Sequence, residues 1–134
     1  DARKLGAKHF VLSTRLENFT AIEGKFDFII DTVSAKHDFT PYLGSLRNDG
    51  TLVLVGAAPE PSEVAAFALI FGRKKLTGSL IGGIRETQEM LDYCQRKRIY
   101  SDIELIPASR INEAYERTVR GQVKYRFVID AKTF

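Results

Sequence analysis

Two apolar stretches, FDFIIDTV (residues 26–33) and TLVLVG (residues 51–56), decide the fold of this chain. Neither stretch alternates cleanly between apolar and polar residues, as a strand with one solvated face would. Both are therefore predicted to be central strands of a parallel sheet that is covered on its two faces. Parallel neighbours need a crossover connection, which is usually a helix.

The segment between these two strands has the pattern of such a crossover helix. Its apolar residues recur at i, i+3, i+4 and i+7, namely Phe39, Tyr42, Leu43 and Leu46. Asp38 is the predicted N-cap and NDG (residues 48–50) the predicted stop. Because β-α-β units connect right-handedly, the pattern favours a doubly wound open sheet with helices on both sides.

The same alternation of strand and helix continues toward both ends of the chain. Further strands are predicted at residues 9–13, 75–80, 102–107 and 126–130. Further helices are predicted at residues 85–97 and 111–119, and a helix end at residues 2–5 with Gly6 as its C-cap. An Asp92–Arg96 ion pair is expected on the first of these helices. The chain is thus predicted to be an α/β protein with a mostly parallel sheet.

Composition limits the classes of function. The chain has 134 residues, of which 44% are hydrophobic and 28% charged, which predicts one globular domain with a single core. Lys and Arg number 20 against 17 Asp and Glu, a balance that indicates neither a nucleic-acid nor a membrane-surface partner. The longest apolar run, residues 64–71, is too short for a membrane span. A single cysteine, Cys94, fits a reducing compartment, so a cytoplasmic location is expected.

Several kinds of active site are absent from the sequence. The only histidine and cysteine residues, His9, His37 and Cys94, are far apart, so no zinc site is expected in this segment. Ser79 does not stand in a G-x-S-x-G elbow, and residues 78–83 lack the Lys-Ser/Thr of a phosphate loop. Cys94 lies on the apolar face of its predicted helix, which favours a buried core thiol over a nucleophile.

Small and polar residues follow three of the predicted strands. These strand ends read DTV (residues 31–33), VGA (residues 55–57) and SLIGG (residues 79–83). In open α/β sheets, ligands bind outside the carboxyl ends of strands. A glycine there lets a planar ring approach the backbone, and a hydroxyl can bond a ribose or a carboxamide. The alternative is that these residues serve only the turns.

The sequence resembles the zinc-dependent medium-chain alcohol dehydrogenases, and within them the NADP-dependent cinnamyl alcohol dehydrogenase-like branch. Seven blocks in the family's order carry the resemblance, and together they cover most of the chain. They are LGAKHF (5–10), FDFIIDTV (26–33), DGTLVLVG (49–56), GRKKLTGSLIGG (72–83), ETQEML (86–91), INEAYE (111–116) and KYRFVID (124–130). The implied fold is a partial Rossmann-type nucleotide-binding domain that lacks its first two strands.

The resemblance also implies a set of NADP-binding residues. Thr32 corresponds to the residue beside the nicotinamide-side ribose, and Gly56 to the backbone position at the nicotinamide. Residues 79–81 correspond to the segment along the nicotinamide and its carboxamide. Lys124 stands where relatives place a basic residue near the pyrophosphate, although a solvated lysine at a strand entrance is an equal alternative. The implied set is Thr32, Gly56, Ser79, Leu80, Ile81 and Lys124.

The parts of the family pattern that this chain does not contain are the catalytic zinc domain and the G-x-G-x-x-G turn. Residues 1–134 are thus expected to be the C-terminal part of a dinucleotide-binding domain with the returning C-terminal helix and strand. The parent would hold zinc, with no ligand from this segment. The strand at 9–13 would lose its neighbour, and a homodimer is expected through the sixth-strand edge near Ser79 to Arg85. Burial against a partner or the missing domain is expected for the apolar segment 64–71.

The implied function of the parent is hydride transfer between NADP(H) and a small alcohol or aldehyde, with zinc polarising the substrate oxygen. The chain alone is predicted to be inactive and to bind NADPH weakly or not at all, because the pyrophosphate turn is absent. The alternative outside enzymology is a binding or interaction module derived from half a Rossmann domain. A third reading is the zinc-free quinone reductase branch of the same superfamily, which the 78–83 and 125–130 blocks argue against.

Overall fold

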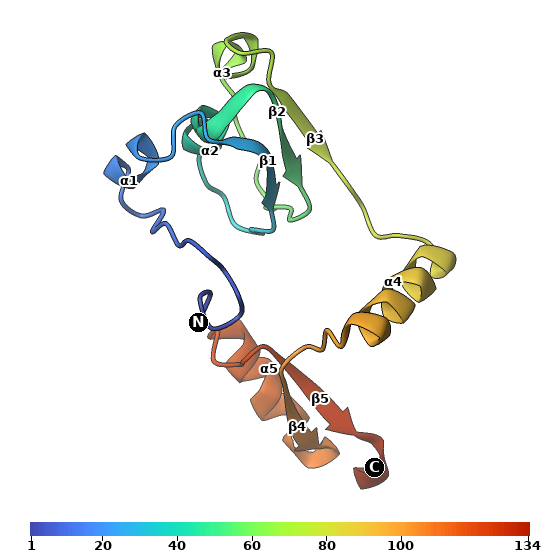
Figure 1. Ribbon diagram of the computed structural model, residues 1–134. Helices are drawn as coiled ribbons and strands as arrows, with labels where there is room; N and C mark the ends of the chain where they lie inside the picture. The colour runs from blue at the N-terminus through green and yellow to red at the C-terminus, as the bar shows by residue number, and fades with distance from the viewer. The chain divides into compact units, whose positions relative to one another are not determined.

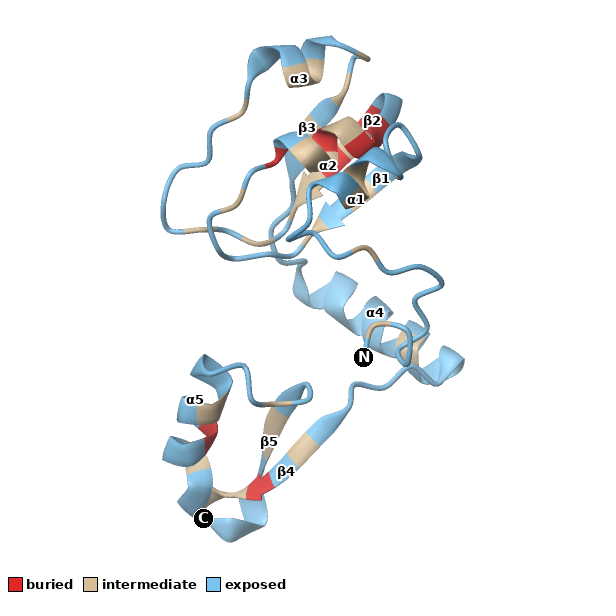
Figure 2. Ribbon diagram, turned by 90° about the vertical axis from the view of Figure 1, so that its left-hand side faces the viewer, coloured by how far each residue is buried: buried red, intermediate tan, exposed pale blue.

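The computed structural model describes residues 1–134, which form two compact units, Asp1–Ile81 and Gly82–Phe134. The buried residues fall into two groups, one at α2 and β2 and one at β4 and α5 (Figure 2). This differs from the single core expected from the length. Each unit thus has buried residues of its own.

The first unit is built on a three-stranded parallel sheet of order β1-β2-β3 (Figure 1). Its elements are α1 (Glu17–Thr20), β1 (Phe26–Asp31), α2 (Thr40–Ser45), β2 (Leu46–Leu54), α3 (Ala66–Ile70) and β3 (Lys75–Gly78). The three strands coincide with predicted ones, and α2 and α3 are the crossovers between them. The α/β class and the parallel sheet are thereby confirmed.

One face of this sheet carries the core. Ile29, Leu52 and Leu76 are aligned partners on neighbouring strands, and Leu52 is fully buried. Helices α2 and α3 pack on this face. The buried cluster is Phe39, Leu43, Leu46 and Leu52. The opposite face carries the neighbouring pair Ile30 and Val53, and Ile30 is 59% exposed. The sheet was predicted to be covered on both faces, but within this unit helices cover only one of them.

Helix α2 begins one residue later than predicted and ends early. Its N-cap is Phe39 rather than Asp38. The Asp38 carboxylate accepts a hydrogen bond from the backbone N–H of Thr40 at 2.8 Å, and the Thr40 hydrogen bonds hold the pKa of Asp38 below its ordinary value. The helix stops at Ser45 rather than at residues 48–50, because Leu46 already pairs with Phe26 in the sheet. The predicted stop lies within β2 instead, at the shift of register between the Phe26–Leu46 and Phe28–Thr51 pairs, with Asp49 in the left-handed region at φ 63°.

The C-terminal end of α2 is tied to β3 by a lysine. The ammonium of Lys74 donates to the carbonyl oxygen of Leu43 at 2.6 Å, where a cation also complements the helix dipole. Replacing Lys74 by methionine keeps the apolar stem and removes this bond, so we expect the free energy of unfolding to fall by about 1 kcal/mol. Urea denaturation followed by circular dichroism measures the change. The matched control is Lys75→Met, an exposed neighbour, and an equal loss in both variants would contradict the assignment.

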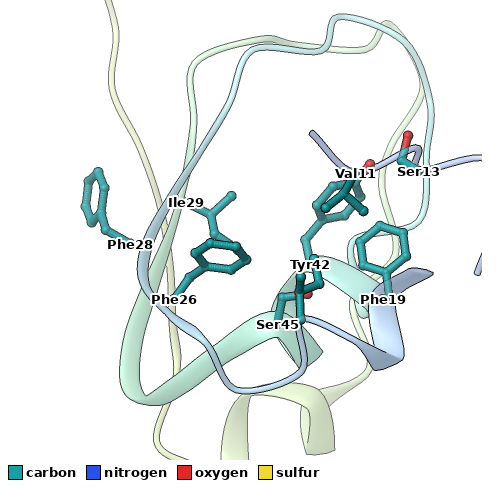
Figure 3. A pocket seen from close by; sticks show the side chains of 9 residues that line it. Val11, Ser13, Phe19, Phe26, Phe28, Ile29, Tyr42 and Ser45 are labelled. Atoms are coloured by element: carbon teal, nitrogen blue, oxygen red, sulfur yellow. The ribbon is translucent and has the colours of Figure 1, made fainter. Parts of the chain in front are cut away.

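The strand predicted at residues 9–13 does not form. A strand needs a partner for its backbone N–H and C=O groups, and no strand of the sheet lies beside this segment. Its residues instead help to line an apolar hollow of about 310 Å³ on the free side of β1 (Figure 3). The lining residues are Val11, Ser13, Phe19, Ile22, Phe26, Phe28, Ile29, Tyr42 and Ser45. Phe19 and Tyr42 meet edge to face there, with centroids 5.1 Å apart.

The second unit is a smaller β-α-β arrangement beside a separate helix. Its elements are α4 (Ile84–Lys97), β4 (Ile103–Pro107), the 3₁₀ turn Ala108–Arg110, α5 (Ile111–Val119), β5 (Arg126–Asp130) and the 3₁₀ turn Ala131–Thr133. Strands β4 and β5 pair in parallel, and Ile106 and Ala114 are buried between them and α5. All four predicted elements are confirmed.

Helix α4 differs from its prediction in two side-chain details. Asp92 accepts a hydrogen bond through Oδ1 from Gln88, one turn earlier, at 2.8 Å, and the expected pair with Arg96 is not formed. Cys94 is half-buried rather than a core thiol, and its Sγ lies 3.7 Å from the sulfur of Met90. The apolar face of α4 therefore adds nothing to a core within this chain. No helix of the protein is long and apolar enough to span a bilayer.

Candidate functional site

The carboxyl ends of β1, β2 and β3 lie in register at one edge of the first sheet. Asp31, Leu54 and Gly78 are aligned partners, so the chain leaves all three strands at the same level. Backbone hydrogen bonds continue one step beyond them, since the N–H of Val55 donates to Asp31 at 2.9 Å and that of Ser79 to Leu54 at 3.1 Å. The three predicted strand ends thus meet at one edge.

The loops that follow β1 and β2 cross in contact. A Cβ atom on Gly56 would lie 2.5 Å from the carbonyl oxygen of Val33 and 2.8 Å from the carbonyl carbon of Thr32, so only glycine fits there. An open hollow of about 390 Å³ lies between these loops and α2. Its lining includes Val33, His37, Phe39, Leu54, Gly56 and Glu60. This hollow is the candidate ligand site of the first unit.

The predicted cofactor residues divide into those gathered at this edge and those that are not. Thr32, Gly56 and Ser79 lie at the three adjoining strand ends, and Thr32 and Ser79 are exposed. Leu80 and Ile81 follow directly but are each 90% exposed, with no packing partner. A ligand at these strand ends would therefore meet backbone groups and hydroxyl groups. The exposed apolar segment Leu80–Ile81 lies next to them.

Lys124 lies in the second unit, in the turn before β5. Its backbone N–H donates to the Glu104 carboxylate at 3.1 Å, and the other oxygen of Glu104 accepts from Arg117 at 2.6 Å. The Arg117 guanidinium lies over the ring of Phe127, 4.7 Å from its centroid. Glu104 therefore links β4, α5 and the turn that carries Lys124.

Acid is expected to loosen this turn through Glu104. The hydrogen bonds from Arg117 and from Lys124 hold the pKa of Glu104 below its ordinary value of 4.5. A carboxyl with a lowered folded pKa stabilises the fold fully above about pH 4.5 and loses that contribution as the pH falls through the folded pKa. Replacing Glu104 by glutamine should remove this part of the acid sensitivity, measured as the thermal midpoint between about pH 7 and about pH 3.

The control for that experiment is Glu116→Gln. Glu116 is exposed on α5 and lies 3.6 Å from Arg120, so its substitution should leave the pH profile close to that of the unaltered chain. If the Glu104 and Glu116 variants showed the same profile, the special role of Glu104 would be wrong.

A half-buried contact between His37 and Asp31 at the end of β1 was missed by sequence reasoning. His37 Nε2 lies 2.8 Å from Asp31 Oδ2, with side chains that are 21% and 9% exposed. The other oxygen of Asp31 accepts from the N–H of Val33 at 2.9 Å. The sequence offered only one signal, an acidic residue at a strand end with a histidine six positions later, and this spacing has no meaning without the loop that folds it back.

The donor groups can be compared with what zinc and a nucleotide require. No three His, Cys, Asp or Glu side chains of the chain converge, so these residues do not fit a zinc site and no step is assigned to zinc here. A nucleotide fits better. The edge joins an open hollow, two exposed hydroxyls and a close backbone crossing, which suit a planar ring and a ribose.

Comparison with known proteins agrees with this geometry. The family model described as zinc-binding dehydrogenase matches residues 1–96. The chain belongs to the zinc-binding dehydrogenase family. Within it, the chain falls among the cinnamyl alcohol dehydrogenase-like members, as its sequence blocks indicated.

Three zinc-binding dehydrogenase relatives illustrate the match. The probable formaldehyde dehydrogenase AdhA of Bacillus subtilis is 50% identical over 99% of this chain and 38% of its own length. The structure of a cinnamyl alcohol dehydrogenase from Sorghum bicolor superposes with a TM-score of 0.91 at 39% identity, over 96% of this chain and 36% of that one. The structure of CAD from Helicobacter pylori, complexed with NADP(H), superposes with a TM-score of 0.81 at 39% identity, over 98% of this chain and 38% of that one.

These zinc-binding dehydrogenases are much longer than the chain described here. The chain spans a little over a third of the length of each of the three. The shared portion includes the Rossmann-like half, which confirms the predicted fold class. The TM-scores above 0.8 over nearly the whole chain show that the observed elements are those of the family.

Proposed function

We propose that this chain is the cofactor-binding portion of an NADP-dependent alcohol dehydrogenase that acts on a small alcohol or aldehyde. The observation that carries the proposal is the edge where Thr32, Gly56 and Ser79 meet. When bound, the nicotinamide supplies or accepts the hydride. The chain's own residues bind and orient it: backbone at Gly56 admits the flat ring, and the exposed hydroxyls bond ribose and carboxamide.

NADP rather than NAD is supported by the relative from Helicobacter pylori, whose structure holds NADP(H). The whole set of Thr32, Gly56, Ser79, Leu80, Ile81 and Lys124 is proposed to contact the cofactor. Lys124 would serve the pyrophosphate as a cation held in place through Glu104. Zinc would be held by the part of the enzyme that this chain does not include, and a cytoplasmic location is proposed with it.

A homodimer is also proposed, through the outer edge of β3 and residues 79–85. Strand β3 is an edge strand, and its backbone groups on that side have no partner strand within the chain. A second copy could extend the sheet there and cover Leu80 and Ile81. Sedimentation of the chain and of its Leu80→Glu variant would decide, since only the variant should be monomeric.

The proposed function is tested by a chimera. In CAD from Helicobacter pylori, the matching segment is replaced by residues 1–134 of this chain. We expect the purified chimera to reduce an aromatic aldehyde with NADPH, and the isolated chain to show no activity.

The controls separate misfolding from lack of function. The unaltered Helicobacter enzyme sets the reference rate, and circular dichroism establishes that the chimera is folded. A folded chimera that binds NADPH in fluorescence titration but turns over no aldehyde would place the defect outside the cofactor site. A folded chimera that binds no NADPH would overturn the proposal and favour the alternative of a non-enzymatic interaction module.

A further inference from the structure

We propose that His37 is a positioning residue for the loop of residues 32–36. It acts through Asp31, and it positions Thr32, whose backbone lies against Gly56, and Val33, which lines the 390 Å³ hollow with Gly56. No step of the proposed function uses His37 directly. The effect of His37 on cofactor binding rests on the proposed function. The effect of His37 on the position of the loop does not depend on that function.

The imidazole bridges two points of the chain. Its Nε2 lies 2.8 Å from the Asp31 carboxylate and its Nδ1 lies 2.8 Å from the carbonyl oxygen of Ala35. A carboxylate oxygen and a carbonyl oxygen are both hydrogen-bond acceptors, so each ring nitrogen of His37 faces an acceptor. The ring thereby ties the middle of the loop to the end of β1.

Asp31 passes this constraint on to both loops of the site. Its free carboxylate oxygen accepts from the N–H of Val33 at 2.9 Å, which fixes the turn that contains Thr32. Its backbone carbonyl accepts from the N–H groups of Val55 and Gly56, at 2.9 and 3.3 Å. One residue thus holds the two loops that cross at Gly56, and His37 holds the carboxylate of that residue in place.

The surroundings of His37 keep the ring in one orientation. It meets the ring of Phe39 edge to face with centroids 4.9 Å apart, and that of Tyr42 at 5.7 Å. The Asp31 side chain is only 9% exposed, and a buried carboxylate that loses its partner is costly. The neighbouring carboxylates are Asp38 in the adjoining loop and Glu60 across the hollow.

Three substitutions at His37 separate the contributions of its two hydrogen bonds from that of the packing of its ring. Glutamine places an amide N–H near the position of Nε2 and keeps the bridge to Asp31. Asparagine places one near Nδ1 and keeps only the bridge to Ala35. Phenylalanine keeps a ring and loses both. Amide spectra of the 134-residue chain, recorded without cofactor, report on the loop through the N–H groups of Val33 and Gly56.

The expected result is that the glutamine variant retains the Val33 and Gly56 amide positions, whereas the asparagine and phenylalanine variants both shift them. Asp31→Asn, whose amide has one acceptor oxygen in place of the two of the carboxylate, should resemble the phenylalanine variant. If phenylalanine left these amides unchanged, or if glutamine disturbed them as much as phenylalanine does, the ring would act by packing alone and the proposal would be overturned.

The consequence for the cofactor is measured in the same chimera. Loss of the Asp31 bridge should raise the KM for NADPH by about tenfold while kcat changes by less than about twofold, because the loop binds the cofactor equally in ground and transition states. The glutamine variant should stay within about threefold of the parent. A chimera that fails to bind NADPH at all would count against the proposed function, while the cofactor-free spectra would still decide the role of His37.

Discussion

Replacing Leu52 by alanine is expected to lower the free energy of unfolding by about 2 to 5 kcal/mol. Leu52 is fully buried at the middle of β2 and packs with Phe39, Leu43 and Leu46. Removing its branched end leaves a cavity between the sheet and α2 that neither can fill. Small domains are stable by only about 5 to 15 kcal/mol, so this single change removes a large part of the total.

Urea denaturation followed by far-UV circular dichroism measures this loss. The matched control is Ile30→Ala, which removes an aliphatic side chain from the open face of the same sheet, where Ile30 is 59% exposed. We expect the control to cost less than about 1 kcal/mol. If both variants lost the same stability, the open face would be as well packed as the core, and the one-sided covering of the sheet would be wrong.

Replacing Gly56 by alanine should displace the loop after β1 and weaken NADPH binding in the chimera by about tenfold or more. The new Cβ would lie 2.5 Å from the carbonyl oxygen of Val33, and because the neighbour is backbone it cannot move aside like a flexible side chain. Overpacking of this kind costs about 1 to 3 kcal/mol. The clash also moves the loop after β1, which is proposed to contact the cofactor. The affinity for NADPH and the stability of the fold should therefore both decrease.

Gly44→Ala is the control for this substitution. Gly44 lies in α2, no atom stands within 4 Å of the Cβ that alanine would add, and alanine favours a helix over glycine by about 0.5 to 1 kcal/mol. The control should therefore be neutral or slightly stabilising and leave the KM for NADPH unchanged. An unchanged KM in the Gly56 variant would show that the crossing of the two loops is not part of the cofactor site.

Much of the candidate site could be predicted, and the part that could not has a clear cause. The strand ends that carry Thr32, Gly56 and Ser79 were predicted, because parallel strands end at one edge whatever packs around them. The choice of these three as cofactor residues came from the family resemblance. The crossing of the loops at Gly56 and the bridge from His37 to Asp31 were not predicted. Both depend on how the chain folds back after β1, which no local pattern in residues 32–38 specifies.

The sequence by itself determined the order of the elements and the parallel α/β class. The apolar runs of β1 and β2 and the helical spacing in α4 and α5 are local signals, and each is sufficient to set its own element. It also carried the family resemblance, because the seven blocks keep their order along the chain.

Only the tertiary structure decided which of these elements find partners. Residues 9–13 have the composition of a strand but no neighbour to bond, and the sheet is covered on the face of Leu52 and open on that of Ile30. The same holds for the placing of Lys124 in a second unit and for the meeting of His37 with Asp31. Each of these outcomes is a contact between residues distant in sequence, and such contacts are set by the competition of whole elements for one another's surfaces.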